Sequence, residues 1–153
     1  ATALDNTITA LAERDRQKKA VEVLAVWPDS KDESQDATKR LAARAADDNF
    51  FVRHGVVDAL RQRQADPDLL DDAVAACALA DIRARTCENN ASQLGLNELS
   101  RLIQKGARTA ISQHMPKDAL FELQGHASAS AACVDENVAS HVLRDFAALM
   151  NAR

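Results

Sequence analysis

Histidine and carboxylate side chains, which bind metal ions in many proteins, occur at helical spacing in two places. Asp118, Glu122 and His126 are four residues apart, so they fall near one face of a helix. His141 precedes Asp145 by the same spacing. A di-iron site between helices needs Glu-x-x-His on two helices, whereas this chain has a single Glu-x-x-x-His. We therefore interpret both groups as exposed, salt-bridging helix faces and expect no metal.

Cysteine is the other residue type here that could carry a reaction, because a thiolate is a strong nucleophile. Cys87 follows Arg83 and Arg85, but no histidine lies beside it in the sequence to act as its base. Cys77 and Cys87 could form a disulfide across a helix–helix corner, or all three cysteines, with Cys133, could be thiols in the core. The chain has no glycine-rich phosphate loop, serine nucleophile elbow or haem-attachment motif. We expect no catalytic residue, no cofactor and no enzyme activity.

The charge pattern bears on the possible partners. The 153 residues carry a net charge of −4, and the acidic excess lies in residues 64–95, which hold six acidic and two basic side chains. A protein that binds duplex nucleic acid needs several phosphate contacts from Lys and Arg, and no region is strongly basic. The longest apolar run, residues 73–80, is too short to span a bilayer. We expect neither nucleic-acid binding nor membrane insertion.

Composition indicates a helical fold. The hydrophobic fraction is 46%, much of it alanine, and aromatic residues make up only 3%. Alanine favours helices and lets them approach closely. Four glycines and three prolines leave few tight turns, which argues against a sandwich or barrel of strands. We predict one all-α domain over residues 1–153.

The most informative stretch runs from residue 47 to residue 63. Acidic and amide side chains that can cap a helix open it. Val52, Val56, Val57 and Leu60 then form one apolar stripe at helical spacing. Arg53 lies beside this stripe in the first turns, where its guanidinium can reach back to the turn or to a neighbouring helix.

This stretch resembles the HEAT family of helical repeats. That family's pattern is an acidic turn, Val-Arg, two small or apolar residues, and Ala-Leu. Here these positions are held by Asp47 and Asp48, by Val52 and Arg53, by Val56 and Val57, and by Ala59 and Leu60. The resemblance implies a short α-solenoid of antiparallel helix pairs; the alternative is an irregular helical bundle.

A second, weaker copy of the pattern begins at Asp81, with Ile82 and Arg83 thirty residues after Val52 and Arg53. Its later positions hold asparagine where apolar residues are usual. In both copies an arginine follows an acidic turn, and Arg85 lies close by. The structural interpretation is that Arg53, Arg83 and Arg85 tie their helices to the preceding turns. The functional one is that they line a groove that receives acidic groups of a partner.

The remaining helices are predicted from apolar periodicity and capping residues. Ser30 opens a capping box, Asp66 and Pro67 start a helix, Gly95 ends one, Asn97 caps the next and Gly106 breaks or bends it. The predicted ranges are 3–12, 17–26, 30–46, 50–63, 67–79, 82–94, 97–111, 116–125 and 135–150.

Together these observations predict a non-enzymatic scaffold or interaction domain that binds a protein or peptide. The prediction rests on the repeat resemblance and on the lack of a catalytic motif. The alternatives are an enzyme accessory, a helical module of a larger protein, or a helical protein that binds a chromophore or metal.

Overall fold

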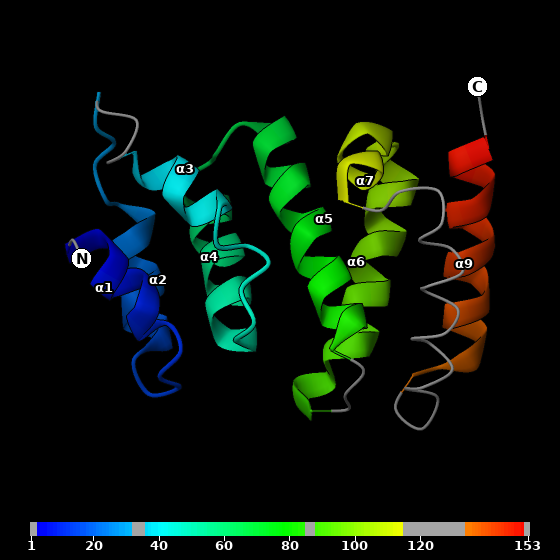
Figure 1. The fold of residues 1–153 in the computed structure, drawn as a ribbon, viewed down its shortest axis with the longest axis horizontal. Helices are drawn as coiled ribbons and strands as arrows, with labels where there is room; N and C mark the ends of the chain where they lie inside the picture. The colour runs from blue at the N-terminus through cyan, green and yellow to red at the C-terminus, as the bar shows by residue number, and fades with distance from the viewer. Residues whose placement is uncertain (1–2, 32–35, 85–87, 115–133, 152–153) are drawn as a thin grey trace. The chain divides into compact units, whose positions relative to one another are not determined.

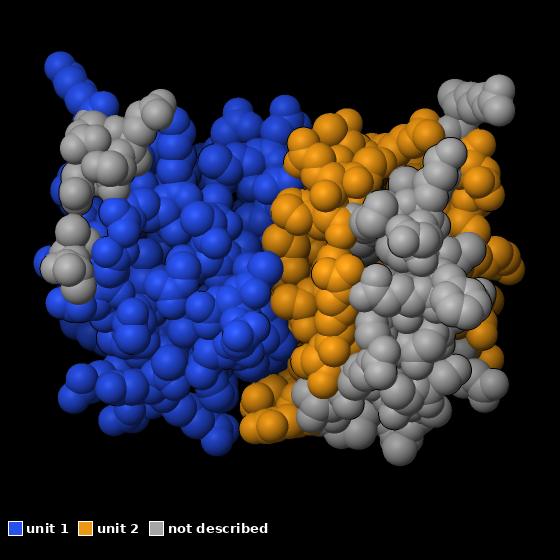
Figure 2. Space-filling view, in the orientation of Figure 1, with its two compact units in different colours: residues 1–73 blue, residues 74–153 orange. Residues whose placement is uncertain are grey.

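Every regular element of the computed structural model is a helix within the residues that it describes, which are 3–31, 36–84, 88–114 and 134–151 (Figure 1). The all-α prediction is confirmed. The chain divides into two compact units, Ala1–Ala73 and Val74–Arg153 (Figure 2). The division falls inside one continuous helix, α5 (Pro67–Arg83). No helix in the described part is both long and apolar enough to cross a membrane.

Unit 1 is built around α4, which contacts the three helices before it. Its core consists of aliphatic side chains at the predicted spacing, among them Leu24, Val56 and Leu60, which are fully buried. Gly55 lies on α4 where a Cβ would come within 2.7 Å of the side chain of Leu11, so its lack of a side chain makes room for that leucine. Among the described residues, the helices that lie wholly in this unit are α1 (Ala3–Ala10), α2 (Gln17–Ala25), α3 (Ala37–Ala42) and α4 (Phe50–Gln62).

Both ends of α4 are fixed by local hydrogen bonds. At its start, Oδ1 of Asn49 accepts from the backbone N–H groups of Phe51 and Val52 at 2.9 and 3.1 Å, as an N-cap does. At its end, Gln64 adopts a left-handed conformation with φ 55°. The N–H of Gln64 then donates to the carbonyl of Arg61 and the next N–H to that of Leu60, which is the Schellman arrangement.

The predicted start of the third helix at Ser30 is wrong. Ser30 lies outside any helix, and α3 begins only at Ala37. The reason is a later cap: the carboxylate of Asp36 accepts from the N–H of Thr38 at 3.1 Å. After Ala42 the chain continues in tighter, three-residue turns rather than as α-helix.

Unit 2 contains the second half of α5 and the helices that follow, and α6 packs against both α7 and α9. The last helix begins within one residue of its predicted start, and Oδ1 of Asp135 accepts there from the N–H groups of Asn137 and Val138, as an N-cap does. Gln93 of α6 in turn accepts from the N–H of Asp135 at 2.9 Å, which joins the start of α9 to α6. The elements after α5 are the 3-10 helix η2 (Glu88–Asn90), α6 (Ala91–Lys105), α7 (Arg108–His114) and α9 (Glu136–Asn151).

The predicted helix over 82–94 is wrong, since α5 continues to Arg83 and α6 begins at Ala91. Between them Asn89 and Asn90 have positive φ angles of 56° and 58°, which interrupt the helix. Gly95 lies inside α6, and a Cβ there would come within 2.7 Å of the backbone oxygen of Ala78 on α5, which explains why this position is a glycine. It is a packing residue rather than a helix end.

The predicted helix start at Asn97 is also wrong. Asn97 lies in the middle of α6 and does not cap it, whereas the predicted break at Gly106 is confirmed by its φ of 79°. The predicted helix 116–125 lies outside the described residues, as do Arg85, Asp118, Glu122, His126, Cys87 and Cys133.

Candidate functional site

Arg53 is buried in unit 1, with 3% of its surface exposed. Its Nη1 donates to the carbonyl oxygens of Asp47 and Asp48 at 3.3 and 3.1 Å. The guanidinium thus closes back on the turn that precedes its own helix. This position agrees with the structural interpretation of the residue, with one difference: the acceptors here are the backbone carbonyls of the acidic residues.

Several aromatic side chains lie at the start of α4. The guanidinium carbon of Arg53 lies 5.3 Å from the ring centroid of Phe50, within the range of a cation–π interaction. The ring of His54 lies against that of Phe50, tilted by 33°, with 4.3 Å between the ring centroids. The ring of Phe51 contacts Phe50 edge to face. Arg53 is therefore buried beside an aromatic ring, in surroundings where its hydrogen bonds are stronger than in water.

Arg63, which was not among the predicted site residues, makes four hydrogen bonds in unit 1. The side chain is only 7% exposed. Nη1 donates to the carbonyl oxygens of Leu24 and Trp27 at 2.7 and 2.6 Å, at the end of α2. Nη2 donates to Asp29 at 2.7 Å and Nε to the hydroxyl of Thr38 at 3.1 Å. One side chain at the end of α4 therefore holds α2, the segment after it and α3.

Asp29 completes this network with its carboxylate. Oδ1 also accepts from the hydroxyl of Thr38 at 3.0 Å. Burial alone raises the pKa of Asp29, but the hydrogen bond from Thr38 and the positive charge of Arg63 outweigh it, so the pKa lies below its ordinary value of 3.8. The carboxylate is thereby kept in the charged form that Arg63 binds.

The other two predicted arginines are placed differently. Arg83 is the last residue of α5 and is exposed, whereas Arg85 lies outside the described residues. Arg53 belongs to unit 1 and Arg83 to unit 2. The partner-binding role of the three arginines stays a prediction; of the two that the structure describes, Arg53 is buried and Arg83 is exposed.

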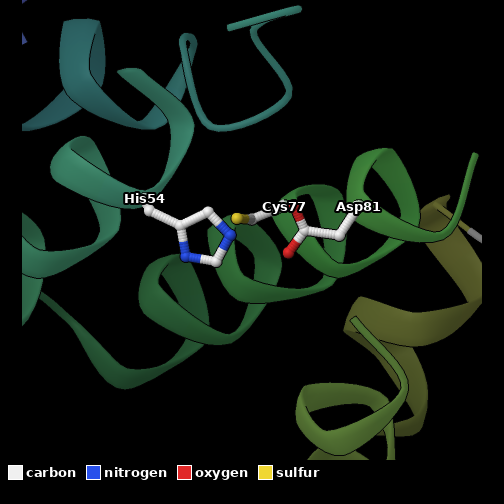
Figure 3. Close-up of side chains that lie close together, drawn as sticks. All are labelled: His54, Cys77 and Asp81. Carbon is white, nitrogen blue, oxygen red and sulfur yellow. The ribbon is translucent and has the colours of Figure 1, made fainter. Parts of the chain in front are cut away.

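Two buried side chains on α5 could act as metal ligands. Cys77 is 4% exposed and Asp81 is fully buried, and they lie one helical turn apart (Figure 3). Figure 3 also labels His54, which belongs to α4 in unit 1. A thiolate and a carboxylate bind Zn²⁺ or similar ions, but such sites use at least three protein ligands. This pair was not predicted, because a spacing of four residues places two side chains on one helix face without showing that both are buried.

Arg53 and Arg63 donate hydrogen bonds to backbone carbonyls, and Arg63 also binds the carboxylate of Asp29. These bonds hold the neighbouring turns in place. A guanidinium donates hydrogen bonds and has no acceptor capacity, so Arg53 and Arg63 suit a structural role that satisfies acceptors. In comparisons with known proteins, the chain matched no family model, no curated protein and no solved structure.

Proposed function

We propose that this protein is a non-enzymatic scaffold that binds a protein or peptide through the surface of a short, HEAT-like stack of antiparallel helix pairs. The proposal continues the resemblance seen in residues 47–63. It assigns Arg53 to the fold and Arg83 to the partner.

The observation that supports the proposal is the position of Arg53. In a stack of helix pairs, each turn must be held so that the next pair can lie against it, and a buried arginine that binds the carbonyls of the turn serves this purpose. Short connections, such as the one from Gln62 to Pro67, favour antiparallel neighbours. Repeated helix pairs of this kind offer an extended surface rather than a deep pocket, which suits a macromolecular partner.

Arg83 is the residue through which we expect the partner to be recognised. It is exposed at the end of α5, and a guanidinium binds carboxylates in a bidentate manner. The expected partner therefore presents an acidic segment to this end of the helix.

The test is to isolate proteins that the purified chain captures from lysate of its source cells, and then to measure each purified candidate by calorimetry. We expect saturable binding that Arg83→Glu weakens tenfold or more, about 1.4 kcal/mol. Arg101→Glu is the matched control, because Arg101 is exposed on α6 and undergoes the same change of charge. It should leave the affinity within twofold.

Two outcomes would count against the proposal in different ways. If no purified candidate binds saturably, the scaffold function is refuted. If a partner binds but Arg83→Glu and Arg101→Glu behave alike, the scaffold function stands and the role of Arg83 is wrong. Circular dichroism of both variants shows whether either change has disturbed the helices.

A further inference from the structure

We draw no further inference here: the strongest candidate, the buried side-chain pair of Cys77 and Asp81 one turn apart on α5, offers two possible metal ligands, and no third histidine, cysteine or carboxylate among the described residues of unit 2 lies near enough to complete a site.

Discussion

Two arginines, Arg53 in α4 and Arg63 directly after it, bind main-chain carbonyls of neighbouring turns. Arg53 binds the turn before its own helix, and Arg63 binds the carbonyl of Leu24 in the last turn of α2 and that of Trp27 just after this helix. The end of a helix leaves carbonyl groups without intrahelical donors, and a buried one costs free energy unless a donor reaches it. A guanidinium offers five N–H groups in a fixed plane, so one arginine can satisfy several carbonyls at once. These side chains therefore stabilise the turns whose carbonyls they bind.

The network of Arg63 leads to the first prediction. Arg63→Ala leaves the carbonyls of Leu24 and Trp27 and the carboxylate of Asp29 without this donor, so we expect the free energy of unfolding to fall by about 2–4 kcal/mol. Trp27 is the only tryptophan of the chain, and its fluorescence in a urea titration reports the change directly.

The control for Arg63→Ala is Arg61→Ala, an exposed arginine on the same helix, which should cost less than about 0.5 kcal/mol. Arg63→Lys should fall between the two, because an ammonium keeps the charge but cannot reach all four partners. Equal stabilities for Arg63→Ala and Arg61→Ala would show that the network contributes nothing.

The second prediction compares two helix ends with the same geometry and different residues. Gln64 after α4 and Gly106 after α6 both have positive φ, and in both cases the next N–H donates to the carbonyl four residues before them. A side chain in this conformation costs about 1 kcal/mol relative to glycine. We expect Gln64→Gly to raise the free energy of unfolding by about 0.5–1 kcal/mol.

Gly106→Ala should lower the free energy of unfolding by about 1 kcal/mol. No atom lies within 4 Å of the position that its Cβ would occupy, so the cost comes from the backbone alone and not from a clash. Urea titrations followed by circular dichroism measure both variants. Changes of the same sign would contradict this assignment of the two helix ends.

At the scale of the element, the sequence predicts what local hydrogen bonds decide. The starts of α4, α5 and α9 follow from Asn49, Asp66 and Asp135, whose side chains bind N–H groups two or three residues later. A capping pattern contains all of this information within one turn. The prediction fails where tertiary packing decides, as at Gly95, which serves contact with α5 although a glycine at that place in the sequence is also typical of a helix end.

The same distinction applies to the candidate site. The bonds of Arg53 reach back five and six residues, so its contact with the turn could be anticipated from nearness in the sequence. Arg63 binds Thr38 and Leu24, which are 25 and 39 residues away. Only the packing of α2, α3 and α4 brings these groups together, and no spacing pattern encodes it. The spacing of Cys77 and Asp81 predicts that they share one helix face, but the sequence alone does not predict that both are buried.

The third prediction concerns how closely helices approach within each unit. A Cβ on Gly95 would come within 2.7 Å of the backbone oxygen of Ala78 and 2.9 Å of Asp81 and Ile82, so α5 and α6 would have to separate. We expect Gly95→Ala to lower the free energy of unfolding by about 2–3 kcal/mol, as other overpacked cores do. Chemical denaturation followed by circular dichroism measures this loss.

Gly55→Ala is the matched comparison, because it also introduces a methyl group on a buried helix face. The three atoms nearest to its new Cβ all belong to the side chain of Leu11 rather than to backbone, and a side chain can adjust more easily than a helix backbone. Alanine also favours helix over glycine by about 1 kcal/mol, which offsets the crowding. The stability of Gly55→Ala should stay within about 1 kcal/mol of the parent protein. A loss as large as that of Gly95→Ala would indicate that side-chain movement does not relieve the contact.

At the scale of the whole molecule, α5 is the element that belongs to both compact units. It begins at Pro67 in unit 1 and ends at Arg83 in unit 2, with the division at Ala73. The division leaves seven residues of α5 in unit 1 and ten in unit 2. Helical segments this short are not stable alone in water, so each part depends on the rest of the helix. We expect this shared helix to make the chain unfold as one domain, in agreement with the single domain predicted from its length.

The last prediction tests this coupling by breaking α5 at the division. Val74→Pro removes an intrahelical hydrogen bond and introduces a steric clash, at a cost of about 3 kcal/mol or more. In the parent protein, Trp27 fluorescence, which reports unit 1, and circular dichroism, which reports both units, should give the same urea midpoint. In Val74→Pro, circular dichroism should separate into two transitions, only one of which coincides with the fluorescence change. Val74→Ala truncates the same buried side chain but keeps the helix, so it should lower the midpoint and preserve a single transition. Two separate midpoints in the parent protein would mean that the units fold independently although they share a helix.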